Sequence, residues 1–402
     1  MRHRVRSCLV GSALLACVTV LGDCGGDPLP DLCSYTSVPL EANALTLLAD
    51  ARLDKAGPGF LLLGSDKDNI RWATLSAAGA LGIPGMVAVP AHSDGPWFGA
   101  AGTTASPGSS VVVAYAANPA AGMADLMTFA VDVATGTAST PAMIAKVPDR
   151  GTSPVIVATG SGRAGENVGI AWGQVGTSTV SALVLGPDGR PLAGPINAGS
   201  VQDLDCLRFV PGKNDLTLSY VRPDPEGTFT LYFQELAAGG QPGPARTLPM
   251  GNVRVGCPAF VPAPVGYGIA WKELGTPPSS HGRGDVFAAI GDGNAPFLAA
   301  IVLSNERVSG GDAPPVVGLG STSNTKFTLL FAQRSGGQAW QVDQRGNKTS
   351  QPITLPSTHG NTGAVSTSPV GTSLFATYAD YSSADPTNQA AGTRLFLEVT
   401  CK

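Results

Sequence analysis

Short runs of apolar residues that end in an aromatic residue recur along this chain at regular intervals. The runs are Val111–Tyr115, Val168–Trp172, Leu216–Tyr220, Tyr267–Trp271, Phe327–Phe331 and Leu374–Tyr378. Their final aromatic residues lie 47 to 60 residues apart, and a copy without the aromatic, Phe60–Gly64, precedes them. Apolar runs of this length, bounded by Gly, Pro, Asn and Asp, predict buried β-strands. We expect the aromatic row to be core because it follows the repeat.

Each run has three companions, so the repeating unit predicts four strands. A strand with small or proline residues at its start lies upstream, and a strand that ends in a tight turn at Gly136, Gly189 or Gly346 lies downstream. A fourth short strand is expected to close with a proline. The prolines are Pro84, Pro141, Pro195 and Pro352. Four strands in about 50 residues are typical of a β-propeller blade. A single blade cannot bury both of its faces, whereas blades stacked in a ring bury each face on a neighbour. The prediction is an all-β, seven-bladed propeller, with six or eight blades as alternatives.

The last unit contains only three strands, over residues 361–402, and an unassigned strand at Cys33–Pro39 opens the propeller. We therefore expect the N-terminal strand to complete the last blade and close the ring. Cys33 and Cys401 would then be neighbours, and a disulfide between them is predicted. Cys206 and Cys257 occupy matching positions in consecutive units, which predicts a second disulfide between blades. The alternative for this second pair is two buried thiols.

The first 23 residues have the pattern of an export signal. Basic residues at positions 2, 4 and 6 precede an uncharged run of 14 residues, Cys8–Leu21. That run is too short to span a bilayer, which needs about 20 residues. The expected organisation is a signal peptide over 1–23, a linker over 24–32 and the propeller over 33–402.

Two cysteines sit in segments that resemble bacterial lipoboxes, around Cys17 and around Cys24. Asp23 departs from the small residue that the motif places before the cysteine, and ordinary cleavage after Gly22 is a third possibility. Lipidation at Cys24 leaves four cysteines, which can pair completely. We therefore favour Cys24 over Cys17 as the lipidated residue. Lipidation at either cysteine and ordinary cleavage would each follow export to a compartment where disulfides persist.

Composition excludes several classes of protein. The 402 residues include 52 Gly and 33 Pro, and only 13% are charged, about half the usual share. The ample apolar content argues against disorder, and the Gly and Pro content argues against long helices. The net charge of −4, with no basic tract, argues against a nucleic-acid partner.

The repeat resembles a class of exported bacterial β-propellers. The clearest copy is Gly169–Trp172, followed by Ser181–Gly189 with its Pro-Asp-Gly turn, and then by Gly194 and Pro195. The resemblance covers nearly all of the chain after the leader. It implies a surface or secreted binding scaffold and does not indicate an activity.

Candidate ligand-binding residues lie in the loops that lead from the fourth strand of one blade to the first strand of the next. They are His92, Asp94, Arg150, Asp203, Asp205, Arg254, Glu306 and His359. The turns between second and third strands add charged residues to the same face, among them Asp66, Asp68 and Asp380. A ring of mixed charge at a channel mouth suits a polar ligand such as a glycan or a peptide.

The favoured hypothesis is a non-enzymatic binding or scaffold module for a protein or glycan at the outer membrane, periplasm or surface of a bacterium. Contact with the membrane would be through the lipid alone, and the chain would be a monomer. We expect no cofactor and no metal, because Asp66–Asn69 lacks the Gly and Glu that a calcium loop needs. The alternative is a hydrolase or lyase that acts on a polysaccharide or lactone at the channel mouth, and fold alone does not decide between them.

Overall fold

The structure is a computed structural model in which the chain is built from β-strands. It describes residues 29–41, 43, 45–46, 52–56, 59–66, 68–89, 98–103, 109–120, 122–148, 155–161, 167–174, 179–186, 191–200, 207–210, 216–223, 229–236, 242–251, 258–262, 267–273, 284–290, 301–302, 317–323, 326–333, 336–343, 345, 347–356, 361–370, 373–381 and 393–402. Within these ranges the regular elements are 28 strands, β1 to β28. The expected all-β class is confirmed.

Six sheets are each built from four strands that follow one another along the chain. Sheet 1 comprises β2 (Arg52–Ala56), β3 (Gly59–Ser65), β4 (Asn69–Leu75) and β5 (Leu81–Ala88). Sheet 2 comprises β6 (Phe98–Thr103), β7 (Ser110–Ala120), β8 (Met123–Asp132) and β9 (Ala142–Pro148). Sheet 3 comprises β10 (Val155–Ser161), β11 (Val168–Gln174), β12 (Thr179–Leu185) and β13 (Pro191–Ser200). Sheet 4 comprises β14 (Arg208–Val210), β15 (Leu216–Pro223), β16 (Phe229–Leu236) and β17 (Arg246–Gly251). Sheet 5 comprises β18 (Ala259–Pro262), β19 (Tyr267–Glu273), β20 (Gly284–Ile290) and β21 (Ile301–Val302). Sheet 6 comprises β22 (Val317–Ser323), β23 (Lys326–Gln333), β24 (Gly336–Asp343) and β25 (Ile353–Thr354). All of these strand pairs are antiparallel.

Sheet 7 joins the two ends of the chain. It contains β26 (Asn361–Val370), β27 (Ser373–Tyr381), β28 (Thr393–Cys401) and, on its outer edge, β1 (Cys33–Pro39). Strand β1 runs antiparallel to β28, with Cys33 opposite Cys401 and Pro39 opposite Leu395. The two cysteines are bonded, with their Cα atoms 4.1 Å apart. The predicted N-terminal closing strand and the predicted Cys33–Cys401 disulfide are both confirmed.

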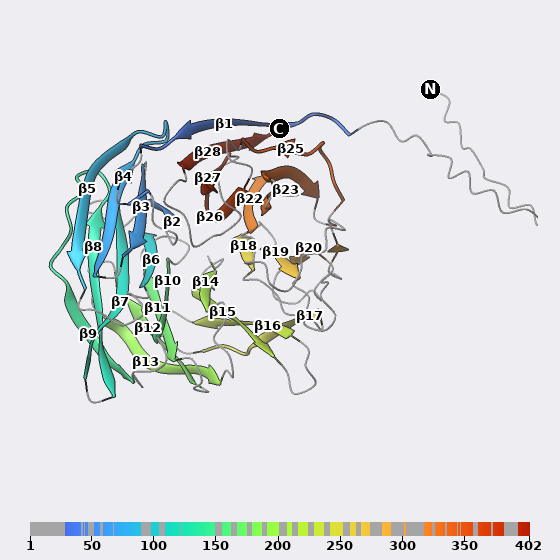
Figure 1. The fold of residues 1–402 in the computed structure, drawn as a ribbon. Helices are drawn as coiled ribbons and strands as arrows, with labels where there is room; N and C mark the ends of the chain where they lie inside the picture. The colour runs from blue at the N-terminus through green and yellow to red at the C-terminus, as the bar shows by residue number, and fades with distance from the viewer. Residues whose placement is uncertain are drawn as a thin grey trace, which may run out of the picture.

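The sheets are arranged around a common centre, with first strands innermost and fourth strands on the periphery (Figure 1). The first strands contact one another in the order β2, β6, β10, β14, β18, β22 and β26, and β26 also contacts β2. Each sheet therefore has a neighbour on both faces. Burial of both faces explains why the second strands are continuous apolar runs without a polar side: Leu61, Leu62 and Leu63 of β3 are all fully buried.

The predicted aromatic row lies in this core. Its buried members are Tyr115, Trp172, Tyr220, Trp271 and Tyr378. The side chain of the sixth member, Phe331, lies outside the described residues. Apolar clusters join neighbouring sheets, and one of them contains Trp72 of sheet 1 together with Phe129 of sheet 2.

The prolines that mark the fourth strands do not close them. Pro141 and Pro352 precede β9 and β25, whereas Pro84 and Pro195 lie inside β5 and β13. A fourth strand is an outer edge, so a residue without an N–H group can face solvent there without losing a ladder bond. The sequence pattern therefore located these strands correctly but placed the prolines wrongly within them.

One predicted glycine turn also links two sheets. Gly136 has a φ of 68°, a conformation that glycine adopts at little cost, and it closes the turn between β8 and β9. Its carbonyl oxygen accepts a hydrogen bond of 3.1 Å from Nε1 of Trp72 in sheet 1. A Cβ atom at Gly136 would approach Ile83 to 3.0 Å. Gly136 thus serves both the turn and the contact between sheets.

Candidate functional site

The eight residues predicted to bind a ligand lie outside the described residues. They are His92, Asp94, Arg150, Asp203, Asp205, Arg254, Glu306 and His359. The same holds for Cys17 and Cys24, predicted for lipidation, and for Cys206 and Cys257, predicted to pair. These assignments stay predictions.

The structure does describe part of the predicted face, where sheets 1 and 7 meet. We call this part the candidate face; it comprises residues 39–41, 43, 45–46, 66, 68–69, 380 and 394. Strand β1 ends here at Pro39, β3 turns into β4 at Asp66, and β28 begins with Thr393 and Arg394. The backbone N–H of Leu40 donates to the carbonyl oxygen of Arg394 at 2.8 Å, so the end of β1 is held against the start of β28.

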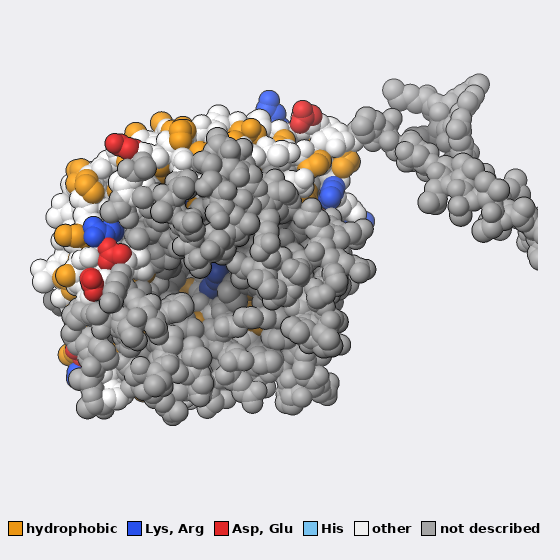
Figure 2. All heavy atoms as spheres, viewed as in Figure 1, with side chains coloured by type: hydrophobic (Ala, Val, Ile, Leu, Met, Phe, Trp, Pro, Cys, Tyr) orange, Lys and Arg blue, Asp and Glu red, His pale blue; other side chains and the backbone are white. Residues whose placement is uncertain are grey.

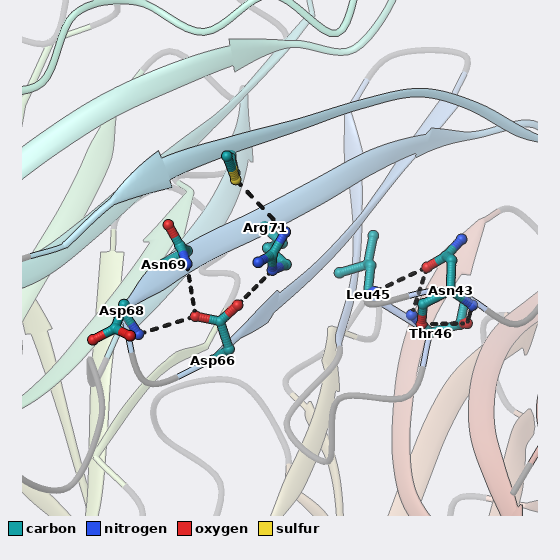
Figure 3. A network of polar contacts seen from close by, with 8 residues as sticks. Asn43, Leu45, Thr46, Asp66, Asp68, Asn69 and Arg71 are labelled. Carbon is teal, nitrogen blue, oxygen red and sulfur yellow. Dashed lines mark hydrogen bonds and ion pairs between the residues drawn. The ribbon is translucent and has the colours of Figure 1, made fainter. Parts of the chain in front are cut away.

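Asp66 organises the turn between β3 and β4. Its Oδ1 accepts hydrogen bonds of 3.0 Å from the backbone N–H of Asp68 and from Nδ2 of Asn69. Its Oδ2 accepts a bond of 2.5 Å from Nε of Arg71, which forms an ion pair (Figure 3). Partial burial raises the pKa of Asp66, but the hydrogen bonds from Arg71, Asp68 and Asn69 outweigh burial, so the pKa lies below its usual value.

The same contacts explain why this turn differs from a calcium loop. Both carboxylate oxygens of Asp66 already accept hydrogen bonds, one of them from a guanidinium. Within the described ranges, no three His, Cys, Asp or Glu side chains gather where they could hold a metal ion. The absence of a metal in the protein as a whole stays a prediction.

A second polar turn lies between β1 and β2. Oδ1 of Asn43 accepts hydrogen bonds from the backbone N–H groups of Leu45 and Thr46, at 2.9 and 3.0 Å (Figure 3). Oγ1 of Thr46 accepts a bond of 2.9 Å from the backbone N–H of Asn43 and donates to the carbonyl oxygen of Glu41 at 3.0 Å. Reciprocal bonds of this kind fix a short loop without help from regular structure.

A buried arginine ties this turn to sheet 7. Arg394 is 2% exposed, and its Nε donates a hydrogen bond of 3.0 Å to the carbonyl oxygen of Thr46. The sequence analysis did not single out Arg394. The available signal was a charged residue directly before the apolar run Leu395–Leu397. A charge in that position favours a buried polar contact, because a lone buried charge is very unfavourable.

Asp380 also differs from its expected role. It was expected to be a solvent-facing charge in a turn, but it belongs to β27 and is fully buried. Two residues earlier, Tyr378 is fully buried too, and its hydroxyl donates to the carbonyl oxygen of Pro356. Burial, and then the charge of Asp380, raise the pKa of Tyr378 well above its usual value. These groups stabilise the last sheet and are not presented to a ligand.

The candidate face therefore has a solvent-exposed part and a buried part. The exposed part is the Asp66 turn, in which Asp68 is exposed, and the buried part is Arg394 with Asp380. The described residues of the two turns are held by hydrogen bonds to the side chains of Asn43, Thr46 and Asp66. These residues give the face polar groups that a ligand could contact.

No described helix has the length and apolar character needed to cross a membrane. This finding concerns the described ranges only, which begin at residue 29.

The fold defines the class: the chain has the β-propeller fold, with four-stranded antiparallel sheets around a centre. Hydrazine synthase from Kuenenia stuttgartiensis is similar, with a TM-score of 0.52 at 12% identity, over 84% of this chain and 94% of that chain. The β-propeller domain of the Trilobed protease from Pyrococcus furiosus has a TM-score of 0.41 at 8% identity, over 82% and 90%. The Aleuria aurantia lectin, solved with α-methyl-L-fucoside, has a TM-score of 0.42 at 14% identity, over 76% and 94%. No family model matches the chain, and no curated protein matches it.

Proposed function

We propose that this chain is an exported, membrane-anchored, seven-bladed β-propeller. Its function is to bind a protein or glycan, without catalysis, at the outer membrane, in the periplasm or at the cell surface of a bacterium. The partner meets the face that carries the loops between successive blades, and the chain acts as a monomer.

The blade number is supported by the order of contacts around the centre. Six sheets follow the chain order, the seventh combines both ends of the chain, and the first strands contact one another in sequence until β26 meets β2. This cycle of contacts supports the proposed count of seven blades.

The binding role is supported by one observation above all, the hydrogen-bonded polar residues described on the candidate face. The Asp66 and Asn43 turns are each held by several side-chain hydrogen bonds and stand over a packed core. Groups that are ordered before binding lose less conformational entropy when a partner arrives. A scaffold with fixed loops is suited to recognition, and the charged loops predicted around the rest of the ring would supply the specificity.

A glycan array, followed by a matched pair of variants, tests the proposal. The purified full chain is applied to the array, and each hit is titrated by calorimetry and by thermal unfolding. Saturating ligand at 100 times its dissociation constant adds about 2.7 kcal/mol to the free energy of unfolding. We expect the variant Asp94→Ala, Arg150→Ala, Arg254→Ala to lose binding.

The control variant removes three charges from third and fourth strands. It carries Lys146→Ala, Glu235→Ala and Arg246→Ala, on β9, β16 and β17, and should bind as well as the wild type. Equal loss of binding in both variants, or hits that survive only in the first, would remove the predicted face from consideration. An array without hits, together with a pull-down without a protein partner, would contradict the binding role.

The anchor has its own test. The chain is produced in a bacterium from its own leader in the presence of radiolabelled palmitate. We expect label in the wild type and in Cys17→Ser, and none in Cys24→Ser. Label lost in Cys17→Ser and kept in Cys24→Ser would move the anchor to Cys17.

A further inference from the structure

The chain enters the propeller on the face opposite the candidate face. Strand β1 starts at Cys33 and ends at Pro39, beside the turns of the candidate face. Its partner β28 runs the other way and ends at Cys401, so the start of β1 and the end of β28 lie together (Figure 1). We call this end of sheets 6 and 7 the disulfide face; it comprises residues 29–33, 326, 343, 345, 347–351 and 401–402.

The entry segment is held firmly in place on the disulfide face. The carbonyl oxygen of Pro30 accepts a hydrogen bond of 3.1 Å from the backbone N–H of Gln351 in sheet 6. The carbonyl oxygen of Leu32 accepts another of 3.1 Å from the backbone N–H of Lys402. Cys33 follows Leu32, and its Sγ lies 3.3 Å from Oγ of Ser350. The disulfide to Cys401 also holds Cys33 in place. The direction of the chain is thus fixed from Pro30 onward.

Basic side chains outnumber acidic ones on this face. The described basic residues are Lys326, Arg345, Lys348 and Lys402, and the acidic ones are Asp31 and Asp343. Figure 2 shows a basic and an acidic side chain close together on the upper rim, and further basic side chains at the right edge. The carboxylate of Asp343 accepts bonds from the backbone N–H groups of Arg345 and Asn347 and from Nδ2 of Asn347. Partial burial raises the pKa of Asp343, but these bonds and the charge of Arg345 outweigh burial and keep the pKa below its usual value, so Asp343 offsets part of the basic charge. The ammonium of Lys348 lies 4.8 Å from the centre of the Trp340 ring and is exposed to solvent.

Anchoring at Cys24 would keep the disulfide face close to the membrane. Leu29 is five positions after Cys24, and an extended chain covers about 3.5 Å per position, so the span is at most about 18 Å. The headgroup layer on each side of a bilayer core occupies roughly 5–8 Å of this distance. Anchoring at Cys17 would allow more than twice the span and would not orient the propeller.

We propose that the disulfide face of sheets 6 and 7 rests against an anionic lipid surface, with the candidate face directed away from the membrane. The proposal rests on the proposed anchor at Cys24. Lysine and arginine side chains within a Debye length, about 8 Å, of an anionic leaflet are attracted to it. The short tether brings these four basic residues into that range, and the ligand face remains open to partners in solution.

Fluorescence quenching on vesicles tests the orientation. The lipidated full chain is reconstituted into vesicles that contain phosphatidylglycerol and a headgroup-attached quencher. An environment-sensitive fluorophore is placed at Gln351→Cys on the disulfide face or at Asp68→Cys on the candidate face. Both residues are exposed, and the hydrogen bonds in which they take part use their backbone groups. The parent chain is treated with the same fluorophore, and its fluorescence is subtracted as the background from its own cysteines.

We expect quenching at position 351 to exceed quenching at position 68 at least twofold. Equal quenching at both positions, or stronger quenching at position 68, would overturn the proposed orientation. If the wild type carries no palmitate, the anchor itself has failed, which separates this result from an incorrect orientation.

A charge reversal tests the lipid contact. Lys348→Glu should reduce quenching at position 351 on phosphatidylglycerol vesicles and should have no effect on phosphatidylcholine vesicles. The control Lys146→Glu reverses an exposed lysine on β9, near the opposite end of the blades, and should leave quenching unchanged. Equal effects of the two substitutions, or equal quenching of the wild type on both lipids, would show that the basic residues do not contact the headgroups.

Discussion

Two interfaces of the same ring are built from similar apolar surfaces but are fastened differently. Between sheets 1 and 2, which follow each other in the chain, Trp72, Tyr115 and Phe129 pack together, with ring centres 5.6 to 6.0 Å apart. Between sheets 7 and 1, which lie at opposite ends of the chain, Phe60, Phe375 and Phe396 pack at 4.8 to 5.9 Å. The packing is alike, and the covalent and polar links are not.

The closing sheet carries links at both of its ends. The disulfide joins β1 to β28 at one end, and Arg394 binds the carbonyl oxygen of Thr46 at the other. The first interface has the hydrogen bond from Trp72 to Gly136. Bringing together the ends of a long chain costs conformational entropy that neighbouring sheets do not incur to the same extent. The additional links offset that cost where the ring closes.

The largest effect is expected from removal of the disulfide. Cys33→Ser with Cys401→Ser frees two residues 368 positions apart, and the chain-entropy relation gives a loss of about 5–6 kcal/mol in the free energy of unfolding. Urea unfolding of the wild type, the double variant and the reduced wild type measures it. A loss below about 1 kcal/mol would break the comparison, because packing alone would then close the ring.

Aromatic truncation on each side of the comparison should have the next largest effect. Phe60→Ala at the closing interface and Phe129→Ala at the first interface each remove a ring that is at least 97% buried, and we expect each to cost about 3–5 kcal/mol. Similar losses in urea unfolding would show that the two interfaces differ only in their links. If Phe60→Ala costs less than half as much as Phe129→Ala, the closing interface is weaker in packing too.

The core of each sheet was predictable from sequence because burial on both faces leaves a periodic signature. The apolar runs marked all seven second strands, and the missing fourth strand of the last unit identified β1 and its disulfide. The buried polar residues were harder to predict. Asp380 looks like an ordinary turn residue, and Arg394 binds a carbonyl oxygen 348 positions away, a contact that no local pattern encodes. The predicted ligand residues lie beyond the described ranges, so the candidate face could be assembled only from its portion on sheets 1 and 7.

An intermediate effect is expected from the polar link of the closing sheet. Arg394→Leu keeps an apolar stem but removes the charged donor, and it leaves the carbonyl oxygen of Thr46 without this partner, which should cost about 1.5–3 kcal/mol. The control Arg246→Leu, on the outer strand β17, should cost less than about 0.5 kcal/mol. The measurement is urea unfolding, combined with hydrogen exchange of the backbone N–H of Leu40. If exchange at Leu40 is unchanged, Arg394 does not hold the end of β1.

The smallest change in the free energy of unfolding is expected from the Asp66 turn. This turn contributes to neither interface, so its effect serves as a reference for the larger ones. Asp66→Asn removes the ion pair with Arg71, and a partly exposed pair of this kind contributes about 0.5–1 kcal/mol. The pKa of Asp66 is lowered in the folded chain, so its contribution is present above the unfolded pKa of about 3.9 and is lost as pH falls through the lower folded value. The difference in the free energy of unfolding between wild type and Asp66→Asn should therefore be full at pH 7 and should disappear toward pH 2.

The exposed neighbour serves as the control, since Asp68→Asn should change the free energy of unfolding by less than about 0.5 kcal/mol at either pH. A difference for Asp66→Asn that persists at low pH would mean that the hydrogen bonds of the turn, and not the ionised carboxylate, stabilise this part of the candidate face.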